Sequence, residues 1–203
     1  MRKLLFSVLA FLLVLGACTS PQSSQLKTDY TQLVNPFIGT DFTGNTYPGA
    51  QAPFGMVQLS PDNGLGGWDR ISGYFYPDST IAGFSHTHLS GTGAGDLYDV
   101  LFMPVTLPYK EAKGELGIHS KFSHQDEEAS AGYYRVKLQD YNINVELTAT
   151  PRCGVQRYTF PKAESMVILN LKKAMNWDFT MDSQIEIVDS CNIRGYRFSE
   201  GWA

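Results

Sequence analysis

The sequence predicts an all-β domain, an antiparallel β-sandwich, from two observations. First, apolar side chains alternate with polar ones over short segments of the second half, as at Tyr134, Val136 and Leu138. A period of two residues is typical of strands with one buried face. Second, glycine, proline, asparagine and aspartate separate these segments at short intervals, which favours an antiparallel sandwich. Only the regions around Ala112 and Lys172 have the composition of a short helix.

The first half of the domain carries the less regular strands. Residues 31–80 are rich in glycine, proline, asparagine and aspartate, which mark loops and turns. One strand is expected within them, over 54–59. Two more strands are expected over 81–89 and 98–106.

The second half has the clearer pattern. Segments 134–138 and 143–149 both alternate, and residues 140–142 between them have turn chemistry, so a hairpin is expected. The remaining strands are expected over 155–160, 166–171, 184–188 and 192–198.

The first residues predict export. Arg2 and Lys3 precede the apolar run 4–15, which is shorter than the ~20 apolar residues of a membrane-spanning helix. The run ends in Leu15-Gly16-Ala17-Cys18, which resembles the lipobox of bacterial lipoproteins. That resemblance implies cleavage before Cys18, acylation of this cysteine and anchoring of the exported chain to the outer membrane. The alternative is an ordinary signal peptide in which Cys18 is incidental.

The expected organisation is a signal peptide over 1–17, an acylated cysteine with a flexible polar tether over 18–30, and one sandwich domain over 31–203. The net charge is −4 with acids and bases interspersed, so the sequence lacks a nucleic-acid-binding footprint. Aromatic residues make up 13% of the chain, which suits both a β core and a sugar-stacking surface. Cys153 and Cys191 either pair in an exported protein or remain buried free thiols.

Residues 84–93 combine imidazoles, hydroxyls and glycines. Alternate residues of an extended chain point the same way, so His86 and His88 are expected to share one face around Thr87. The two imidazoles would bind a metal, hydrogen-bond a neutral polar ligand or brace a loop. The nearest further metal ligands, at irregular spacing, are Asp96, Asp99, His119 and His124. Asp96 and Asp99 would alternatively cap turns, or act as an acid/base pair if their separation allowed it.

A second candidate site follows two glycines. Trp68 and Asp69 stand after Gly66 and Gly67 in a turn-rich loop. An indole covers the apolar face of a sugar while polar neighbours bond the hydroxyls. A buried tryptophan with its N–H satisfied is the alternative.

At the level of whole motifs, the chain resembles the N-terminal region of glycoside hydrolase family 92, which comprises exo-acting α-mannosidases. The resemblance covers nearly everything after the tether. Its motifs include residues 34–40, 47–50, 53–62, 83–93, 131–134, 146–150, 157–160 and 193–199.

The resemblance implies a β-sandwich packed on a larger (α/α)6 barrel, with the active site between them. Family members are calcium-dependent and invert the anomeric centre. The catalytic acid and base and most calcium ligands are expected in the barrel, so no catalytic or metal-binding residue is assigned in this chain. The implied partner is a mannose-containing glycan, such as an N-glycan or mannan. Its expected contacts are Trp68, Asp69, His86, Thr87 and His88.

The chain also departs from the family pattern. Asn45 stands where many members have histidine, and Gly66-Gly67 before Trp68 looks like the trait of a subgroup. The resemblance therefore leaves the identity of the sugar and of its linkage open. The barrel is absent from these 203 residues, and the chain is expected to be inactive alone. The alternatives are a stand-alone surface glycan-binding lipoprotein and a purely structural scaffold.

Overall fold

The structure, a computed structural model, describes residues 29–91, 93–111, 113, 117–173 and 177–201. The chain divides after Tyr30 into two units, and the fold described below is that of the second, Thr31–Ala203. The expected acylation site, Cys18, lies outside the described residues. Within them, no helix combines the length and hydropathy needed to cross a membrane.

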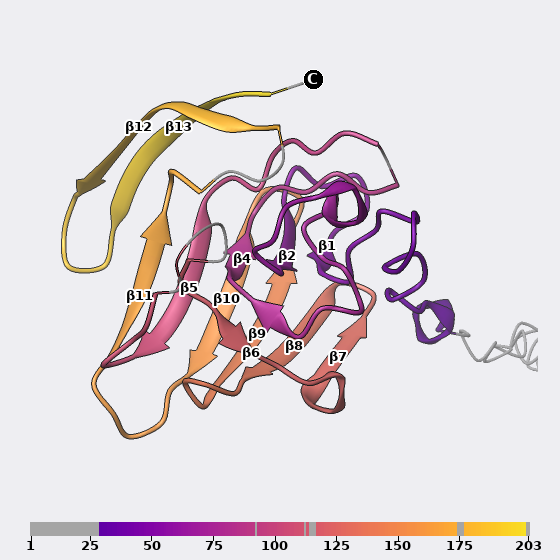
Figure 1. Cartoon of the computed structure of the whole chain (residues 1–203), viewed down its shortest axis with the longest axis horizontal. Helices are drawn as coiled ribbons and strands as arrows, with labels where there is room; N and C mark the ends of the chain where they lie inside the picture. Colours follow the sequence, from indigo (N-terminus) through magenta and orange to yellow (C-terminus); the bar gives the residue numbers. More distant parts are fainter. Residues whose placement is uncertain (1–28, 92, 112, 114–116, 174–176, 202–203) are drawn as a thin grey trace, which may run out of the picture. The chain divides into compact units, whose positions relative to one another are not determined.

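Two antiparallel sheets form the body of the domain (Figure 1). The five-stranded sheet has the order β1-β2-β4-β5-β11, and the four-stranded sheet has the order β10-β9-β8-β7. The strands of the first are Ala50–Gln51, Gln58–Asp62, Gly83–Ser85, Leu101–Thr106 and Ser165–Asn170. Those of the second, from β7 to β10, are Glu127–Ser130, Tyr133–Leu138, Ile143–Ala149 and Gly154–Thr159.

The hydrophobic core lies between these sheets. Leu59, Phe84 and Val105 of the first sheet and Val136 and Leu147 of the second belong to one buried cluster. Burying such apolar side chains contributes about 1.5–3 kcal/mol each, so the core is the main source of stability. The predicted sandwich is confirmed.

The predicted hairpin over 134–149 is also confirmed. Strands β8 and β9 pair from Tyr133↔Thr148 to Leu138↔Ile143. Asn142 adopts a left-handed backbone with φ +53° in the turn, a conformation that asparagine tolerates better than most residues. The alternation of apolar and polar residues therefore places one face of each strand in the core.

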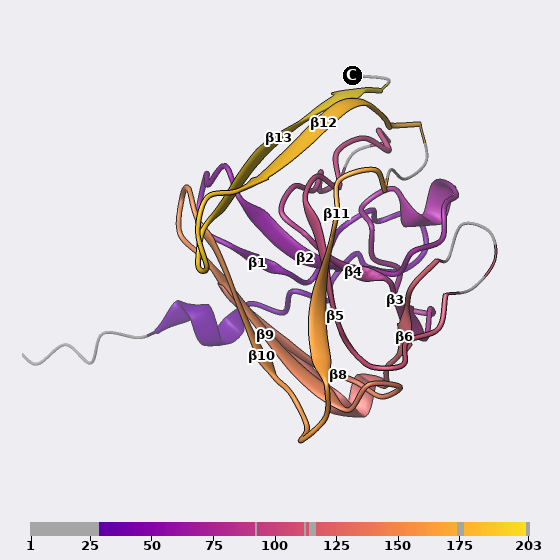
Figure 2. The ribbon, with the colours of Figure 1, turned by 90° about the vertical axis from the view of Figure 1, so that its left-hand side faces the viewer.

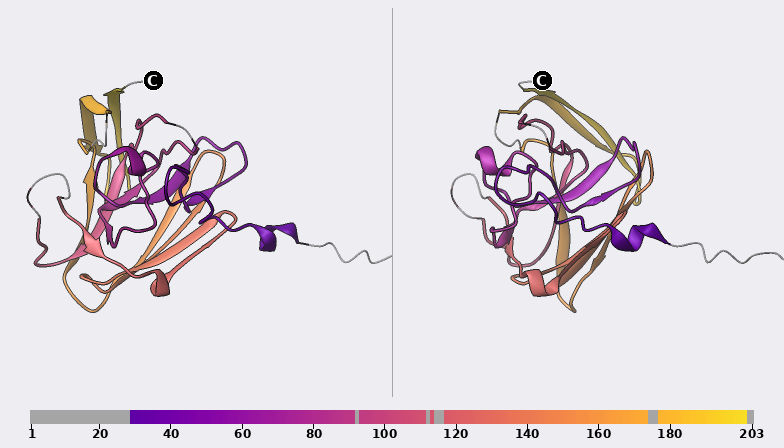
Figure 3. Two further views of the ribbon diagram at one scale, coloured as in Figure 1. Left: turned by 45° about the vertical axis from the view of Figure 1, so that its right-hand side comes forward. Right: turned by 90° about the vertical axis from the view of Figure 1, so that its right-hand side faces the viewer.

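The other elements lie outside the two sheets. The short strands β3 (Thr80–Ile81) and β6 (Ser120–Lys121) pair with each other. Strands β12 (Phe179–Ile187) and β13 (Ile193–Glu200) form a hairpin that lies near β11 (Figures 1 and 2). Figure 3 shows this hairpin, in yellow, apart from the salmon strands.

Single turns of 3-10 helix complete the fold. They are η1 (Tyr30–Leu33), η2 (Trp68–Arg70) and η3 (His124–Asp126). The predicted helix near Lys172 is a bend, and Ala112 lies outside the described residues.

The strand expected over 184–188 begins earlier, at Phe179. Three strands predicted in the first half begin or end elsewhere. The strand expected over 54–59 begins only at Gln58, because Phe54 has φ +56° in a turn closed by a hydrogen bond from Gly55 N to Ala52 O. The strand expected over 98–106 begins at Leu101, after left-handed residues that include Val100. The strand expected over 81–89 is interrupted at residue 82 and ends at residue 85. These loops, rather than the strands, carry the candidate site.

Candidate functional site

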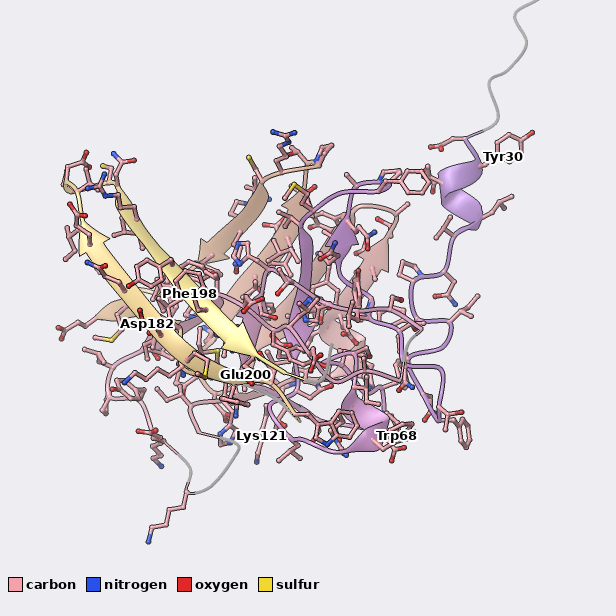
Figure 4. All side chains as sticks on the ribbon, turned by 90° about the horizontal axis from the view of Figure 1, so that it is seen from above. Tyr30, Trp68, Lys121, Asp182, Phe198 and Glu200 are labelled. Atoms are coloured by element: carbon pink, nitrogen blue, oxygen red, sulfur yellow. The ribbon has the colours of Figure 1, made fainter. Side chains whose placement is uncertain are left out.

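Four segments that are distant in sequence meet beside the start of β5. They are the turn η2, the segment 86–99, the segment 177–180 and strand β13. Figure 4 labels Trp68 on η2 and Glu200 at the end of β13. An ionic cluster around Arg197 and a pair of tryptophans hold these segments together.

The guanidinium of Arg197 is the centre of the ionic cluster. Its side chain is only 2% exposed, and its Nη2 donates to Oδ2 of Asp178 at 2.8 Å. Nη1 donates to Oδ1 of Asp99. Nε donates to the Leu171 carbonyl at 3.0 Å and to the Thr180 hydroxyl at 2.9 Å. Burial lowers the pKa of Arg197, while the two carboxylates compensate the buried positive charge.

Asp99 extends this cluster to the predicted site residue Thr87. The Thr87 hydroxyl donates to Oδ2 of Asp99 at 2.9 Å and accepts the Asp99 amide N–H at 2.9 Å. The backbone N–H of Tyr98 donates to the Thr87 carbonyl at 3.0 Å. Thr87 therefore positions the loop that precedes β5, and its hydroxyl is engaged within the protein.

Asp178 experiences opposing electrostatic effects. Burial and the nearby Asp96 carboxylate raise the pKa of Asp178 to about 6, whereas the amide N–H of Phe179 lowers it. The 2.8 Å hydrogen bond from Arg197 also favours the carboxylate. A Cβ placed on Gly201 would lie 2.4 Å from Oδ1 of Asp96, so this glycine lets the chain after β13 pack directly on that carboxylate.

The tryptophan pair lies on the surface of this cluster. The rings of Trp68 and Trp177 have centroids 5.8 Å apart and an interplanar angle of 62°. They are 54% and 46% exposed. A Cβ on Gly93 would lie 3.5 Å from the Trp68 ring, so the backbone at Gly93 passes close to one side of it. Asp69, the next residue, is exposed.

The turn that presents Trp68 is itself fixed. Gly67 enters it with φ +115°, a conformation that a side chain would strain. At its other end, Arg70 makes a bidentate ion pair with Asp78, with distances of 2.6 Å and 2.5 Å. Hydrogen bonding to Asp78 raises the pKa of Arg70, so this cation persists throughout the physiological range.

His88 occupies the interior. Its Nδ1 donates to the Gln58 carbonyl at 2.7 Å, since a carbonyl can only accept. Its Nε2 lies 3.0 Å from Oδ1 of Asp62 and 3.2 Å from Oγ of Ser85. Oδ2 of Asp62 accepts the Ser85 amide N–H at 3.0 Å. Both ring nitrogens thus have protein partners, and the imidazole braces β2 against the loop that follows β4.

His86 has different surroundings. Its Nδ1 donates to the Val100 carbonyl at 3.0 Å, and its ring packs edge-on against Phe102. Burial lowers the pKa of His86, which favours the neutral imidazole. It lines a largely apolar pocket of about 290 Å³ between β5, β11 and the β12–β13 hairpin. Strand β4 ends at Ser85, before both histidines. The alternation of side chains along a strand therefore does not apply to His86 and His88.

The remaining sequence candidates are dispersed. Nδ1 of His119 bonds the Gly117 carbonyl at 3.0 Å, and His124 bonds Glu127 at 2.6 Å. Over the described residues, no group of three or more histidine, cysteine, aspartate or glutamate side chains could hold a metal ion. Cys153 and Cys191 are free and exposed, rather than paired or buried.

Comparison with known proteins identifies the family. Residues 33–203 match the Glycosyl hydrolase family 92 N-terminal domain. The chain belongs to this family. An uncharacterized secreted glycosidase of Arthroderma benhamiae is 29% identical over 157 residues, which are 74% of this chain and 20% of that protein.

Solved structures agree with this assignment. A family 92 α-mannosidase from Bacteroides thetaiotaomicron, in complex with mannoimidazole, is 42% identical with a TM-score of 0.80. The match covers 85% of this chain and 23% of that one. An inverting mannosidase of the same family and organism is 29% identical with a TM-score of 0.66, over 85% and 23% of the two chains. This family 92 domain therefore spans about a fifth to a quarter of the length of these relatives.

Sequence reasoning named Trp68, Asp69 and Thr87 as candidates. It did not name Trp177, Asp178 and Arg197. The structure places Trp177 against Trp68. Arg197 bonds both Asp178 and Asp99, the partner of Thr87. One signal was available, because the dipeptide Trp-Asp occurs at 68–69 and again at 177–178. The role of Arg197 depends on partners 98 and 19 residues away, which no local pattern reveals.

Proposed function

We propose that this chain is the sugar-pocket sandwich domain of an exported, exo-acting α-mannosidase that inverts the anomeric centre and acts on N-glycans or mannan. The observation that carries the proposal is the half-exposed Trp68–Trp177 pair beside Asp69. It occurs in a domain 42% identical to that of a family 92 α-mannosidase whose structure contains mannoimidazole. An exposed indole face and a neighbouring carboxylate supply the apolar and polar contacts that a pyranose needs.

The five predicted contact residues take different parts in this proposal. Trp68 and Asp69 face the sugar directly. Thr87 and His88 position the surrounding loops through Asp99 and Asp62, as their hydrogen bonds support. His86 presents its imidazole to the adjoining pocket.

This domain binds and orients but does not turn over substrate alone. Inversion requires two carboxyl groups ~6.5–9.5 Å apart, with a water molecule positioned between the base and the sugar. Asp99 and Asp178 are instead engaged by the buried Arg197 guanidinium. In our proposal the acid and base therefore come from the (α/α)6 barrel domain.

Calcium, which the family implies, does not fit the described carboxylates. A calcium ion needs six to eight oxygen ligands, and a guanidinium beside them would repel it. Arg197 bonds both Asp99 and Asp178, and no group of three or more histidine, cysteine, aspartate or glutamate side chains among the described residues could hold a metal ion.

A glycan-binding surface lipoprotein is the second candidate. It is favoured by the fact that both tryptophans belong to this chain, so the aromatic corner forms without another domain. Export and an acyl anchor on Cys18 are part of both proposals. The secreted relative from Arthroderma benhamiae supports export.

The test compares binding and turnover by the 203-residue chain. We expect calorimetric heat with α-1,2-mannobiose, none with lactose, and no release of aryl alcohol from an aryl α-mannoside. Hydrolysis of the aryl α-mannoside by the purified chain would contradict the proposal that the catalytic acid and base come from the barrel domain. Binding of lactose as tight as that of mannobiose would contradict mannose as the sugar.

A further inference from the structure

We propose that Trp177 is a second sugar-stacking residue, which together with Trp68 selects glycans of at least two linked sugars over a monosaccharide. This inference rests on the proposed function of the domain. It assigns a binding role to a residue outside the motif that first indicated a sugar site.

The geometry of the two rings supports an extended ligand. At an interplanar angle of 62° and a centroid distance of 5.8 Å, the indoles form a corner rather than a stack. Each indole is about half exposed, with 54% of Trp68 and 46% of Trp177 accessible. A single pyranose stacks on one aromatic plane at a time, so two planes at an angle suit two consecutive sugar rings.

The backbones that carry both rings are held in place. Asp178 follows Trp177 directly and bonds the buried Arg197, which also bonds Asp99. On the other side, a hydrogen bond from Arg70 N to Gly67 O closes the turn that carries Trp68, and the Arg70 side chain is held by its ion pair with Asp78. Fixed aromatic groups lose little conformational entropy on binding, which favours recognition of a ligand.

The polar groups around the corner suit hydroxyl ligands. No indole N–H bond to a protein acceptor is present at Trp68 or Trp177 among the described residues, so each N–H is available to donate. Asp69 adds an exposed carboxylate acceptor beside the corner. Donors and acceptors around an apolar plane are the combination that sugars require.

The experiment measures dissociation constants of the 203-residue chain for α-1,2-mannobiose and methyl α-mannoside, by calorimetry and tryptophan fluorescence. Trp177→Ala is expected to weaken mannobiose binding about three- to tenfold, the effect of one aromatic contact. Methyl α-mannoside, which stacks on Trp68, is expected to change by less than about twofold. Trp177→Phe keeps an aromatic plane and is expected to retain most of the mannobiose affinity.

The matched control is Tyr109→Ala, which removes an aromatic residue 40% exposed beyond the other end of β5. It is expected to leave both constants unchanged, and near-UV circular dichroism verifies the fold of every variant. The proposal is overturned if Trp177→Ala binds mannobiose like the unchanged chain while Trp68→Ala does not. In that case the proposed function survives with one aromatic contact.

Two other outcomes also overturn the inference. If neither Trp68→Ala nor Trp177→Ala alters mannobiose binding, the sugar binds elsewhere on the domain. If the unchanged chain binds neither ligand, the corner is no sugar site in this chain, and the hydrolysis experiment still tests the role of the domain in a mannosidase.

Discussion

Nε2 of His88 lies 3.0 Å from Oδ1 of Asp62, and the two side chains are 0% and 2% exposed. This pair connects the loop after β4 to the end of β2, and the His88 ring packs edge-on against Tyr98 in the loop before β5, with centroids 5.6 Å apart. A buried polar pair of this kind is costly to break, because the remaining partner stays unpaired in a low dielectric.

Asp62→Ala is therefore expected to lower the free energy of unfolding by about 3–5 kcal/mol. The substitution removes the acceptor of both His88 Nε2 and the Ser85 amide. Urea denaturation followed by circular dichroism measures the change. Glu128→Gln, at a side chain 53% exposed, is the control and should change stability by at most ~0.5 kcal/mol. If the two variants changed the free energy of unfolding equally, the buried His88–Asp62 pair would contribute no more to stability than an exposed ion pair.

Arg197→Gln tests the ionic cluster. Loss of the buried guanidinium leaves Asp99 and Asp178 without their shared cation, with an expected cost of about 3–5 kcal/mol. Because Asp178 adjoins Trp177, the tryptophan emission should also change. Arg135→Gln removes an ion pair whose arginine is 58% exposed and serves as the control. An emission spectrum and stability identical to those of the unchanged chain would argue against the cluster as the element that positions Trp177.

His86 predicts a pH dependence of stability. Burial lowers its pKa below the ordinary value of 6.5, so the unfolded chain binds more protons than the folded chain just below pH 6.5. Stability contributed by neutral His86 is therefore present above pH 6.5 and is lost as the pH falls. His86→Gln should flatten the dependence of the unfolding free energy on pH between 5 and 7. A slope that does not change on substitution would assign the dependence to other groups.

Cys18 tests the proposed anchor. Expressed in a Gram-negative bacterium, the chain is expected in the membrane fraction with an acylated N-terminal fragment by mass spectrometry, whereas Cys18→Ser should be recovered in soluble fractions. Cys153→Ser, at an exposed free thiol, is the control. Membrane association that persists in Cys18→Ser would exclude lipidation at this residue as the anchor.

The sandwich could be predicted from the sequence because apolar and polar residues alternate within its individual strands. Val136, Leu138 and Val145 alternate with polar residues, and burial of one face follows from that period alone. The pattern failed around Phe54, where an apolar segment forms a turn and the phenylalanine is fully exposed. There the neighbouring proline and glycine determine the backbone, and hydrophobicity does not.

The site was predicted only in part. Trp68 and Asp69 were recognisable because glycines precede them in a loop. His88 was predicted to bind a metal, to hydrogen-bond a ligand or to brace a loop. Its partners Gln58 and Asp62 are 30 and 26 residues away, and this pairing decides its position. Trp177 became a candidate only when the structure placed it against Trp68. Contacts between distant loops are fixed by tertiary packing, which local composition does not encode.

The most direct test of the central claim is an NMR titration of the 203-residue chain with α-1,2-mannobiose, following the indole N–H signals. Substitution of each tryptophan assigns the signals. If the sugar binds at the aromatic corner, the signals of Trp68 and Trp177 shift together with one saturation curve. If both signals stay fixed while resonances elsewhere in the domain shift, or if nothing shifts, the corner does not bind the glycan.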